Sequence, residues 1–427
     1  MNEATLQGAS GGPGVAGGGP GVGDSGPGVA GGGPGVAGGG PAVAGGGPGV
    51  ARGTAAVDGR GADWTTIDTP ALLVDLDRLE ANIDWMAGHA RSGGVALRPH
   101  FKTHKSAEIV RRQLAAGAVG ITVAKLDEAE AVVDAGIDTS ILLAFQVVAA
   151  PKLERAIRLA ARTRLIMAVD SAEGARAVNA AAAAAGTRLE VWIEIDSGLR
   201  RCGVLPADAP ALARAVTGLG ALQLTGMFTH AGQSYAARSV GEVEAIAATE
   251  TRSVVDAAAA TRAIGIPIET VSAGATPTAR FLDGASGLTE IRPGTYVFYD
   301  NLQVALGTAT PEQCALSIAT TVVSRPTPDR AVVDGGSKTF GLDRGAHSNS
   351  PLTQYGRLLD IEGGLVRLSE EHGVLEIPPD SPIRIGDRIR IVPNHVCSVS
   401  NLARRFYGLR GRVVEQVMTI DAAGGVH

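Results

Sequence analysis

The 427-residue sequence lacks the features that mark secreted, membrane-spanning and nucleic-acid-binding proteins. Its three cysteines, Cys202, Cys314 and Cys397, are too few and too scattered for a disulfide framework, which favours a reducing compartment. No apolar run approaches the roughly 20 residues that a membrane helix needs, and the N-terminus lacks the basic start and apolar core of a secretory signal. The formal net charge of −5 leaves no basic footprint for nucleic acid. We therefore expect a cytoplasmic protein with neither nucleic acid nor a membrane as partner.

Residues 1–62 are of low complexity. The unit Gly-Gly-Gly-Pro-Gly-Val-Ala recurs between Gly11 and Ala51, and 25 of the 59 glycines precede Asp63. Such a composition cannot bury enough apolar surface to offset the conformational entropy that ordering would remove. We predict a disordered Gly/Pro/Val/Ala-rich tail over residues 1–62.

From residue 63 to residue 301, short apolar runs alternate with amphipathic stretches of helical period. The alternation predicts eight strands separated by helices, which is the pattern of a (β/α)8 TIM-type barrel, with a doubly wound open sheet as the competing topology. The predicted strands are Val95–His100, Gly120–Ala124, Ile141–Phe145, Arg164–Asp170, Leu189–Asp196, Leu222–His230, Glu269–Ala273 and Glu290–Phe298.

The sequence pattern changes after Asn301 from alternating strands and helices to mainly β-forming runs. Runs such as Ala319–Ser324, Ala331–Asp334 and Arg384–Val392 are rich in β-forming residues and are separated by Gly, Pro and Asp turns. We predict a barrel domain over 63–301 and a second, mostly β domain over 302–427.

The segment Arg98-Pro99-His100-Phe101-Lys102-Thr103-His104-Lys105 lies just beyond the first predicted strand. Catalytic groups collect at the carboxyl ends of strands in parallel α/β folds. A lysine held there among other basic groups can lose its proton, as a lysine that forms a Schiff base must. The alternative interpretation of these eight residues is a basic loop on a solvated surface.

Two further strand ends resemble phosphate-binding loops. Ser272-Ala273-Gly274-Ala275-Thr276 ends the seventh predicted strand and opens a helix at Pro277, and Arg292-Pro293-Gly294-Thr295-Tyr296 lies at the eighth. Free N–H groups at a helix start favour anions, and the loops after strands seven and eight commonly bind phosphate in barrels of this type. Together with a lysine at a strand end, they suggest a phosphorylated aldehyde cofactor.

These motifs resemble those of the fold-type III, alanine racemase-like enzymes that use pyridoxal 5'-phosphate. Within that group the sequence is similar to the D-serine dehydratase and D-threonine aldolase branch, over roughly Thr69 to Val417. The segments that carry the resemblance are Arg98–Lys105, Asp196–Gly203, Thr229-His230, Arg292–Gly294, Asp334–Lys338, Leu368–Gly373 and Pro393–Cys397.

The resemblance implies a role for each matching residue. Lys102 would carry the cofactor as a Schiff base and act as the catalytic base. Arg201 would approach the phenolic oxygen, Tyr235 would position the ring or the substrate, and Arg292 would lie at the pyridine nitrogen. The phosphate would be held by Gly274, Ala275, Thr276, Gly294 and Thr295. Each arginine could instead be an ion-paired part of the scaffold, and Tyr235 a packing residue.

His395 and Cys397 form a candidate metal half-site. At a spacing of two on an extended segment, both side chains would face the same way, and a His-x-Cys pair can hold zinc with water or substrate completing the sphere. The resemblance places metal ligands at the same positions. A thiolate favours zinc, with manganese and magnesium as alternatives.

The expected activity is that of a pyridoxal-phosphate- and metal-dependent lyase acting on D-3-hydroxy amino acids. Dehydration of D-serine to pyruvate and ammonia is preferred over D-threonine aldolase activity, which would give glycine and acetaldehyde. An amino-acid racemase would leave the His-x-Cys pair without a role. A non-catalytic pyridoxal-phosphate-binding protein would need only the barrel. The resemblance also implies a homodimer.

Overall fold

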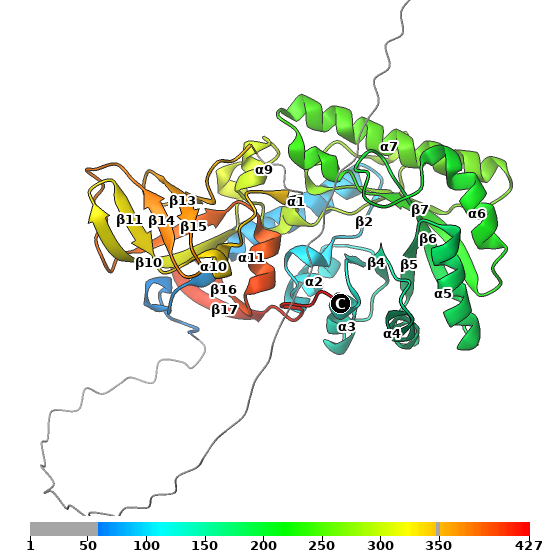
Figure 1. The fold of residues 1–427 in the computed structure, drawn as a ribbon, viewed down its shortest axis with the longest axis horizontal. Coiled ribbons are helices and arrows are strands. Elements are labelled where there is room, and N and C mark those ends of the chain that lie inside the picture. The colour runs from blue at the N-terminus through cyan, green and yellow to red at the C-terminus, as the bar shows by residue number, and fades with distance from the viewer. Residues whose placement is uncertain (1–58, 347–350) are drawn as a thin grey trace, which may run out of the picture. The chain divides into compact units, whose positions relative to one another are not determined.

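A computed structural model describes residues 59–346 and 351–427 (Figure 1). The predicted tail of residues 1–62 lies almost entirely outside them. The described residues form two sheets, one of eight parallel strands and one of nine strands that are mainly antiparallel.

The parallel sheet is the predicted barrel. Its order is β2-β9-β8-β7-β6-β5-β4-β3, and a parallel bridge between His100 and Thr122 joins the two ends of the sheet. The eight predicted strands are therefore confirmed, and the open doubly wound sheet is wrong. They are β2 (Ala96–Leu97), β3 (Ile121–Val123), β4 (Ile141–Gln146), β5 (Leu165–Val169), β6 (Leu189–Ile195), β7 (Leu222–Thr229), β8 (Thr270–Ala273) and β9 (Glu290–Ile291).

Helices follow the barrel strands as the periodicity predicts. The longest, α7, begins after Ser239, whose hydroxyl accepts a hydrogen bond from the Glu242 N–H and so caps the helix. The helices of this part of the chain are α1 (Leu76–Ser92), α2 (Ala107–Ala115), α3 (Leu126–Asp134), α4 (Ala150–Ala160), α5 (Ala172–Ala184), α6 (Ala209–Thr217), α7 (Val240–Ala263), α8 (Thr276–Ala279) and α9 (Asn301–Ala305).

The barrel interior contains a buried ion pair as well as apolar side chains. Arg98 Nε lies 2.7 Å from Glu290 Oε2, and both side chains are at most 6% exposed. Glu290 Oε1 accepts a hydrogen bond of 2.7 Å from Ser272, whose hydroxyl in turn accepts one of 2.9 Å from Arg292 Nε. This chain of contacts connects the barrel core to the strand ends where the site residues were predicted.

The second sheet contains a closed barrel of six strands. Strand β10 pairs with both β11 and β15, which completes the ring β10-β11-β14-β13-β12-β15. The remaining strands extend the sheet from β10 in the order β1-β16-β17. The strands are β1 (Ala71–Asp75), β10 (Leu316–Thr327), β11 (Arg330–Val333), β12 (Gly356–Leu358), β13 (Gly364–Leu368), β14 (Gly373–Glu376), β15 (Arg388–Pro393), β16 (Arg405–Arg410) and β17 (Val413–Thr419).

Strand β1 belongs to this second sheet although it precedes the barrel in the chain. Leu73 pairs with Ser317 of β10 in antiparallel register and with Tyr407 of β16 in parallel register. The domain boundary between residues 301 and 302 stays a prediction. Strand β1 precedes this boundary in the sequence but pairs within the second sheet.

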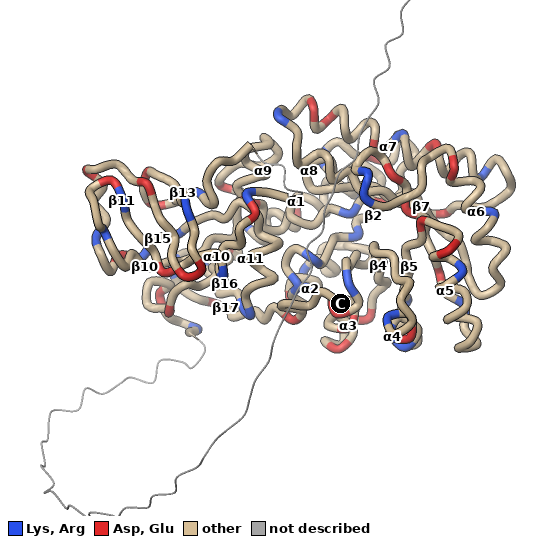
Figure 2. Tube along the Cα trace, in the orientation of Figure 1, with Lys and Arg blue, Asp and Glu red and all other residues tan. Residues whose placement is uncertain are grey.

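Among the described residues, no helix combines the length and the apolar character that a membrane crossing requires. Basic and acidic positions are interspersed along α4, α5 and α7 (Figure 2).

Candidate active site

Lys102 lies in the short 3-10 helix η2 (Phe101–Thr103), directly after the first barrel strand. His100 precedes this turn, and its Nδ1 accepts a hydrogen bond of 3.3 Å from the Lys102 N–H. On the other side, Lys105 adopts a left-handed backbone conformation with φ of 50°, and its ammonium donates to Asn401 Oδ1 at 2.6 Å and to the Gly425 carbonyl at 2.7 Å. The turn that carries Lys102 is therefore held at both ends.

The environment of Lys102 favours a neutral amine. Burial lowers its pKa from 10.5, and the nearby charges of Arg201 and Arg292 lower it further, against the opposing charge of Cys397. A lysine with a lowered pKa can act as a nucleophile and as a base near neutral pH. The surface-loop interpretation of this segment is wrong, because seven of its eight residues are buried and the eighth, Lys102, is half-buried. Phe101, Thr103 and His104 are almost completely buried.

The predicted cofactor residues converge on two adjoining hollows at the strand ends. The larger is a cavity of about 280 Å³, and the smaller is a recess of about 20 Å³. Both are lined by His100, Lys102, His230 and Arg292. Arg201 lines the larger cavity, and the recess is lined by the other predicted residues, Tyr235, Gly274, Ala275, Thr276, Gly294 and Thr295.

Two glycines give the recess its shape. A Cβ at Gly274, whose φ is 127°, would lie 2.9 Å from the Arg292 backbone nitrogen, and a Cβ at Gly294 would lie 2.9 Å from Thr103 Oγ1. Only glycine fits at these two positions without displacing its neighbours. A recess lined by small residues and hydroxyl groups beside a lysine fits the phosphate end of pyridoxal phosphate.

Several N–H groups of the recess already have acceptors within the protein. The Gly274 N–H donates to Glu250 at 2.9 Å, the Ala275 N–H to Thr278 at 3.1 Å, and the Gly294 N–H to Thr276 at 3.2 Å. Because α8 has only four residues, its dipole adds little to anion binding. These glycines would therefore shape the recess more than they would donate to a phosphate.

Arg201 lies at the wall of the larger cavity beside Glu194. Its Nη2 is 3.8 Å from Glu194 Oε1, and the Gln146 amide also donates to this carboxylate. Burial raises the pKa of Glu194, while the Gln146 hydrogen bond and the Arg201 charge oppose the rise. The cavity thus contains one carboxyl group among several basic side chains.

Arg292 is buried and points along the barrel core. Its Nε donates to Ser272, its Nη2 donates to the Thr229 carbonyl, and its guanidinium lies 4.9 Å from the centre of the Phe228 ring. Contacts with neutral groups hold it in place, so the expectation that Arg292 meets the cofactor ring stays a prediction.

His395 and Cys397 meet at the edge of the same turn. The expectation of an extended segment is wrong here, because Cys397 lies in the first turn of α11 (Val396–Leu402) and His395 is the residue before that helix. Their side chains nevertheless contact each other. Cys397 Sγ lies 3.4 Å from Thr103 Oγ1, which places the pair beside the Lys102 turn.

The donor groups of this pair suit a soft divalent metal. Burial would raise the pKa of the Cys397 thiol, but the charge and hydrogen bond of His395, together with the Lys102 charge and the Thr103 hydrogen bond, outweigh burial, and the pKa lies below its usual 9.0. The Asp343 carboxylate binds His395 Nδ1, which leaves Nε2 for a ligand. No group of three or more potential metal-binding side chains occurs in the part of the chain that the structure describes. The assignment of His395 and Cys397 as metal ligands stays a prediction.

The sequence interpretation missed Glu194, Glu250 and Asp343. Glu194 could have been found, because it lies within a predicted strand two residues before the strand-end segment Asp196–Gly203. Glu250 and Asp343 contact site residues distant in the sequence, 24 and 52 positions away, and no local pattern marks them.

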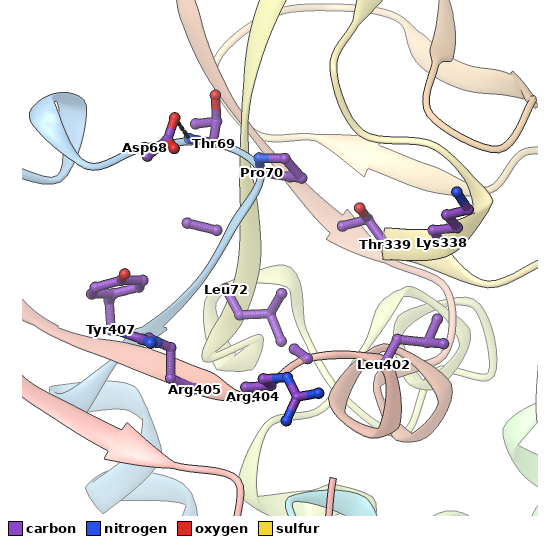
Figure 3. A pocket seen from close by; sticks show the side chains of 12 residues that line it. Asp68, Thr69, Pro70, Leu72, Lys338, Thr339, Leu402, Arg404, Arg405 and Tyr407 are labelled. Atoms are coloured by element: carbon purple, nitrogen blue, oxygen red, sulfur yellow. Dashed lines mark hydrogen bonds between the residues drawn. The ribbon is translucent and has the colours of Figure 1, made fainter. Parts of the chain in front are cut away.

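A further hollow of about 350 Å³ lies in the nine-stranded sheet region (Figure 3). It is formed by the start of β1, α10 (Ser337–Phe340), the end of α11 and the start of β16, and none of the predicted cofactor or metal residues lines it. Its basic groups, Lys338, Arg404 and Arg405, are exposed, and Lys338 pairs with Glu371. The strand-end cavity, with its buried titratable groups, is the stronger candidate for chemistry.

Two family models match the chain. The N-terminal domain of alanine racemase matches residues 74–301, and a putative serine dehydratase domain matches residues 315–409. The D-threo-3-hydroxyaspartate dehydratase of Delftia sp. (strain HT23) is 39% identical over 78% of this chain and 92% of the relative. The D-threonine aldolase of Arthrobacter sp. is 35% identical over 84% of this chain and 93% of the relative.

Solved structures show the same likeness. The crystal structure of D-threonine aldolase from Filomicrobium marinum is 36% identical, with a TM-score of 0.79 over 86% of this chain and 98% of that one. A metal-free variant of the D-threo-3-hydroxyaspartate dehydratase, in which a cysteine is replaced by alanine, has a TM-score of 0.78 and is 36% identical over 84% and 98% of the two chains. The chain belongs to the D-serine dehydratase and D-threonine aldolase family of alanine racemase-like, pyridoxal-phosphate-dependent enzymes.

Proposed function

We propose that this protein is a pyridoxal-phosphate- and zinc-dependent lyase that dehydrates D-3-hydroxy amino acids, with D-serine to pyruvate and ammonia as the simplest case. The observation that carries the proposal is the His395–Cys397 pair, held against the turn that presents Lys102. A soft metal half-site beside a strand-end lysine suits the removal of a β-hydroxyl group.

The chain's own residues would divide the work as follows. Bound pyridoxal phosphate supplies an electron sink that stabilises negative charge at the α-carbon. Lys102, whose pKa is lowered by burial and by the charges of two arginines, would take the α-proton. Arg201 holds a positive charge at the wall of the larger cavity, and the small residues of the recess hold the phosphate and fix the orientation of the ring.

His395 and Cys397 would hold the zinc ion, which supplies a Lewis acid for the β-hydroxyl. Loss of the α-proton and of the hydroxyl as water leaves an enamine, and its hydrolysis gives a 2-keto acid and ammonia. The side chain on the β-carbon is the part of the substrate on which the named relatives differ. We include D-threo-3-hydroxyaspartate among the candidate substrates because a relative that shares 39% of its residues is named for it.

D-Threonine aldolase activity is the second candidate, because a relative and a solved structure with that name share 35% and 36% of their residues with this chain. The same site would then deprotonate the β-hydroxyl and break the Cα–Cβ bond. The thiolate of Cys397 favours zinc and, with it, the dehydration. A homodimer and a cytoplasmic location complete the proposal.

The test is a set of incubations of the purified full-length chain, loaded with pyridoxal phosphate and zinc, with D-serine, D-threonine and D-threo-3-hydroxyaspartate. Keto acid and ammonia are measured beside glycine and aldehyde. Lys102→Ala should abolish product and cofactor absorbance, whereas Lys125→Ala should keep the absorbance. Cys397→Ala should lose bound zinc, whereas Cys202→Ala, which alters the other cysteine near the cavity, should retain it.

Keto acid that disappears with a chelator and returns with zinc is the expected result. Glycine and acetaldehyde as the main products from D-threonine would replace the dehydratase by the aldolase. Racemised substrate, without keto acid or glycine, would refute both lyase activities.

A further inference from the structure

Glu250 is a fully buried carboxylate on α7 that lies behind the recess. Its Oε1 accepts hydrogen bonds from the Ala231 N–H at 3.0 Å and the Gly274 N–H at 2.9 Å, and its Oε2 accepts one from the Thr278 hydroxyl at 2.8 Å. Burial raises its pKa, and these hydrogen bonds and the charge of Arg292 oppose the rise. Its hydrogen bonds are those of an acceptor that organises the backbone around the recess.

The three donors come from three segments that form the recess. Ala231 lies two residues after the end of β7, Gly274 directly follows β8, and Thr278 lies in α8. Thr278 extends the network, because its hydroxyl also accepts a hydrogen bond of 3.1 Å from the Ala275 N–H. One side chain thus fixes the spacing of the two strand ends and the start of the helix that follows them.

The backbone at Gly274 is demanding, so this fixing has a structural consequence. Gly274 has a φ of 127°, and the space where its Cβ would be is closed by the Arg292 backbone nitrogen at 2.9 Å. With its N–H bound to Glu250, the residue turns the following Ala275 and Thr276 along the recess. Without the acceptor, two buried N–H groups would lack a partner, and the loop would have to move to find one.

We propose that Glu250 is the positioning residue for the cofactor's phosphate: it holds the loop of residues 274–276 in the conformation that accepts a phosphate ester. The inference rests on the proposed cofactor site. It concerns cofactor binding alone, so its test needs no substrate and stands apart from the choice between dehydratase and aldolase.

The test compares the affinities of the full-length chain for pyridoxal 5'-phosphate and for pyridoxal, which lacks the phosphate. Both aldehydes can react with Lys102, so a general loss of folding or of lysine reactivity changes the two affinities together. A change in the loop of residues 274–276 changes only the affinity for pyridoxal 5'-phosphate. The readout is the ratio of the two dissociation constants, obtained by absorbance titration of protein stripped of cofactor.

Glu250→Met keeps the length of the side chain and removes the acceptor. We expect it to weaken pyridoxal-phosphate binding on the order of ten- to a hundredfold, since unsatisfied buried N–H groups are costly, and to leave pyridoxal binding within about threefold. Glu250→Gln retains one acceptor oxygen for the two N–H groups and should restore most of the ratio. Inorganic phosphate should compete with pyridoxal phosphate less well in the Met variant than in the unaltered chain.

Glu128 supplies the matched control. It is another buried helix carboxylate that accepts a backbone N–H, that of Ala124 at 2.7 Å, and it pairs with Lys105 at 3.4 Å without lining the recess. Its loss would act on the Lys102 turn and would change the affinities for both aldehydes together. Glu128→Met should leave the ratio unchanged. If Glu250→Met does not fold, Thr278→Val removes one arm of the network and should lower the ratio severalfold. A ratio that stays at its original value in a folded Glu250→Met or Thr278→Val variant overturns the proposal, as does an unaltered chain that binds both aldehydes equally well.

Discussion

Asp343 should control how tightly the proposed metal site binds zinc. Its Oδ2 binds His395 Nδ1, and its Oδ1 accepts a hydrogen bond of 2.9 Å from the Ser398 hydroxyl, which fixes the carboxylate from the other side. A carboxylate at Nδ1 orients the imidazole and increases the basicity of Nε2, the nitrogen left for the metal. Asp343→Asn keeps the size of the side chain and removes its charge.

We expect this substitution to weaken zinc binding by about 10- to 100-fold, the usual effect of altering such a partner, which corresponds to about 1.4–2.7 kcal/mol. Zinc affinity is measured by competition with a chromophoric chelator at constant pH. Asp360→Asn is the control, because the Asp360 side chain is as exposed as that of Asp343, at 35%, and pairs with Arg390 instead of a histidine.

The reasoning would be refuted by an Asp343→Asn variant whose zinc affinity stays within about threefold of the unaltered chain while His395→Ala and Cys397→Ala abolish binding. Such a result would show that the metal ligands are correct and that their orientation does not depend on this carboxylate.

Three further predictions concern stability and the recess. Burial lowers the pKa of His104 from 6.5 to about 3, so the folded state keeps this histidine neutral while the unfolded chain takes up a proton below pH 6.5. The contribution of His104 to the free energy of unfolding is therefore present above pH 6.5 and is lost as the pH falls towards 3. Between pH 8 and pH 5 the free energy of unfolding should fall about 2 kcal/mol less in His104→Gln than in the unaltered chain, as measured by urea titration. Glu290→Leu leaves the buried Arg98 charge without its partner and should cost about 3–5 kcal/mol, most of which Arg98→Met in the same chain should restore; equal stability of the single and double variants would contradict this. Gly294→Ala should weaken pyridoxal-phosphate binding with little change in pyridoxal binding, because the added methyl group meets Thr103 Oγ1; unchanged titration curves would contradict it.

The barrel could be predicted because each strand is a separate local signal. Strands such as β5, Leu165–Val169, are buried at every position and read as continuous apolar runs bounded by polar residues. The count of eight strands favours closure over an open sheet, and the bridge between His100 and Thr122 decides between them. The same holds for Lys102 and the small-residue loops, since they lie directly at the ends of these runs.

The conformation at Cys397 could not be predicted in this way. The run Ile389–Val392 continues into β15, and the chain then turns into a helix of seven residues with no capping side chain at His395. Nothing in the local sequence marks that start. The acceptors Glu250 and Asp343 were missed for a related reason, because their partners come from elements that the topology, and not the sequence spacing, brings together.

The place of β1 couples the folding of the two sheets. The whole parallel barrel is inserted between β1 and β10, so the first strand stays without its partners until the barrel and most of the remaining chain have been made. Closing so long a loop is entropically costly for a flexible chain, whereas a folded barrel holds the ends of the insertion at a fixed separation. Assembly of the second sheet should therefore wait for the barrel, and a substitution that unfolds the barrel should release β1 as well. On unfolding, the two sheets should lose structure in one transition, which makes the cofactor-binding part of the chain the scaffold for the part that carries His395 and Cys397.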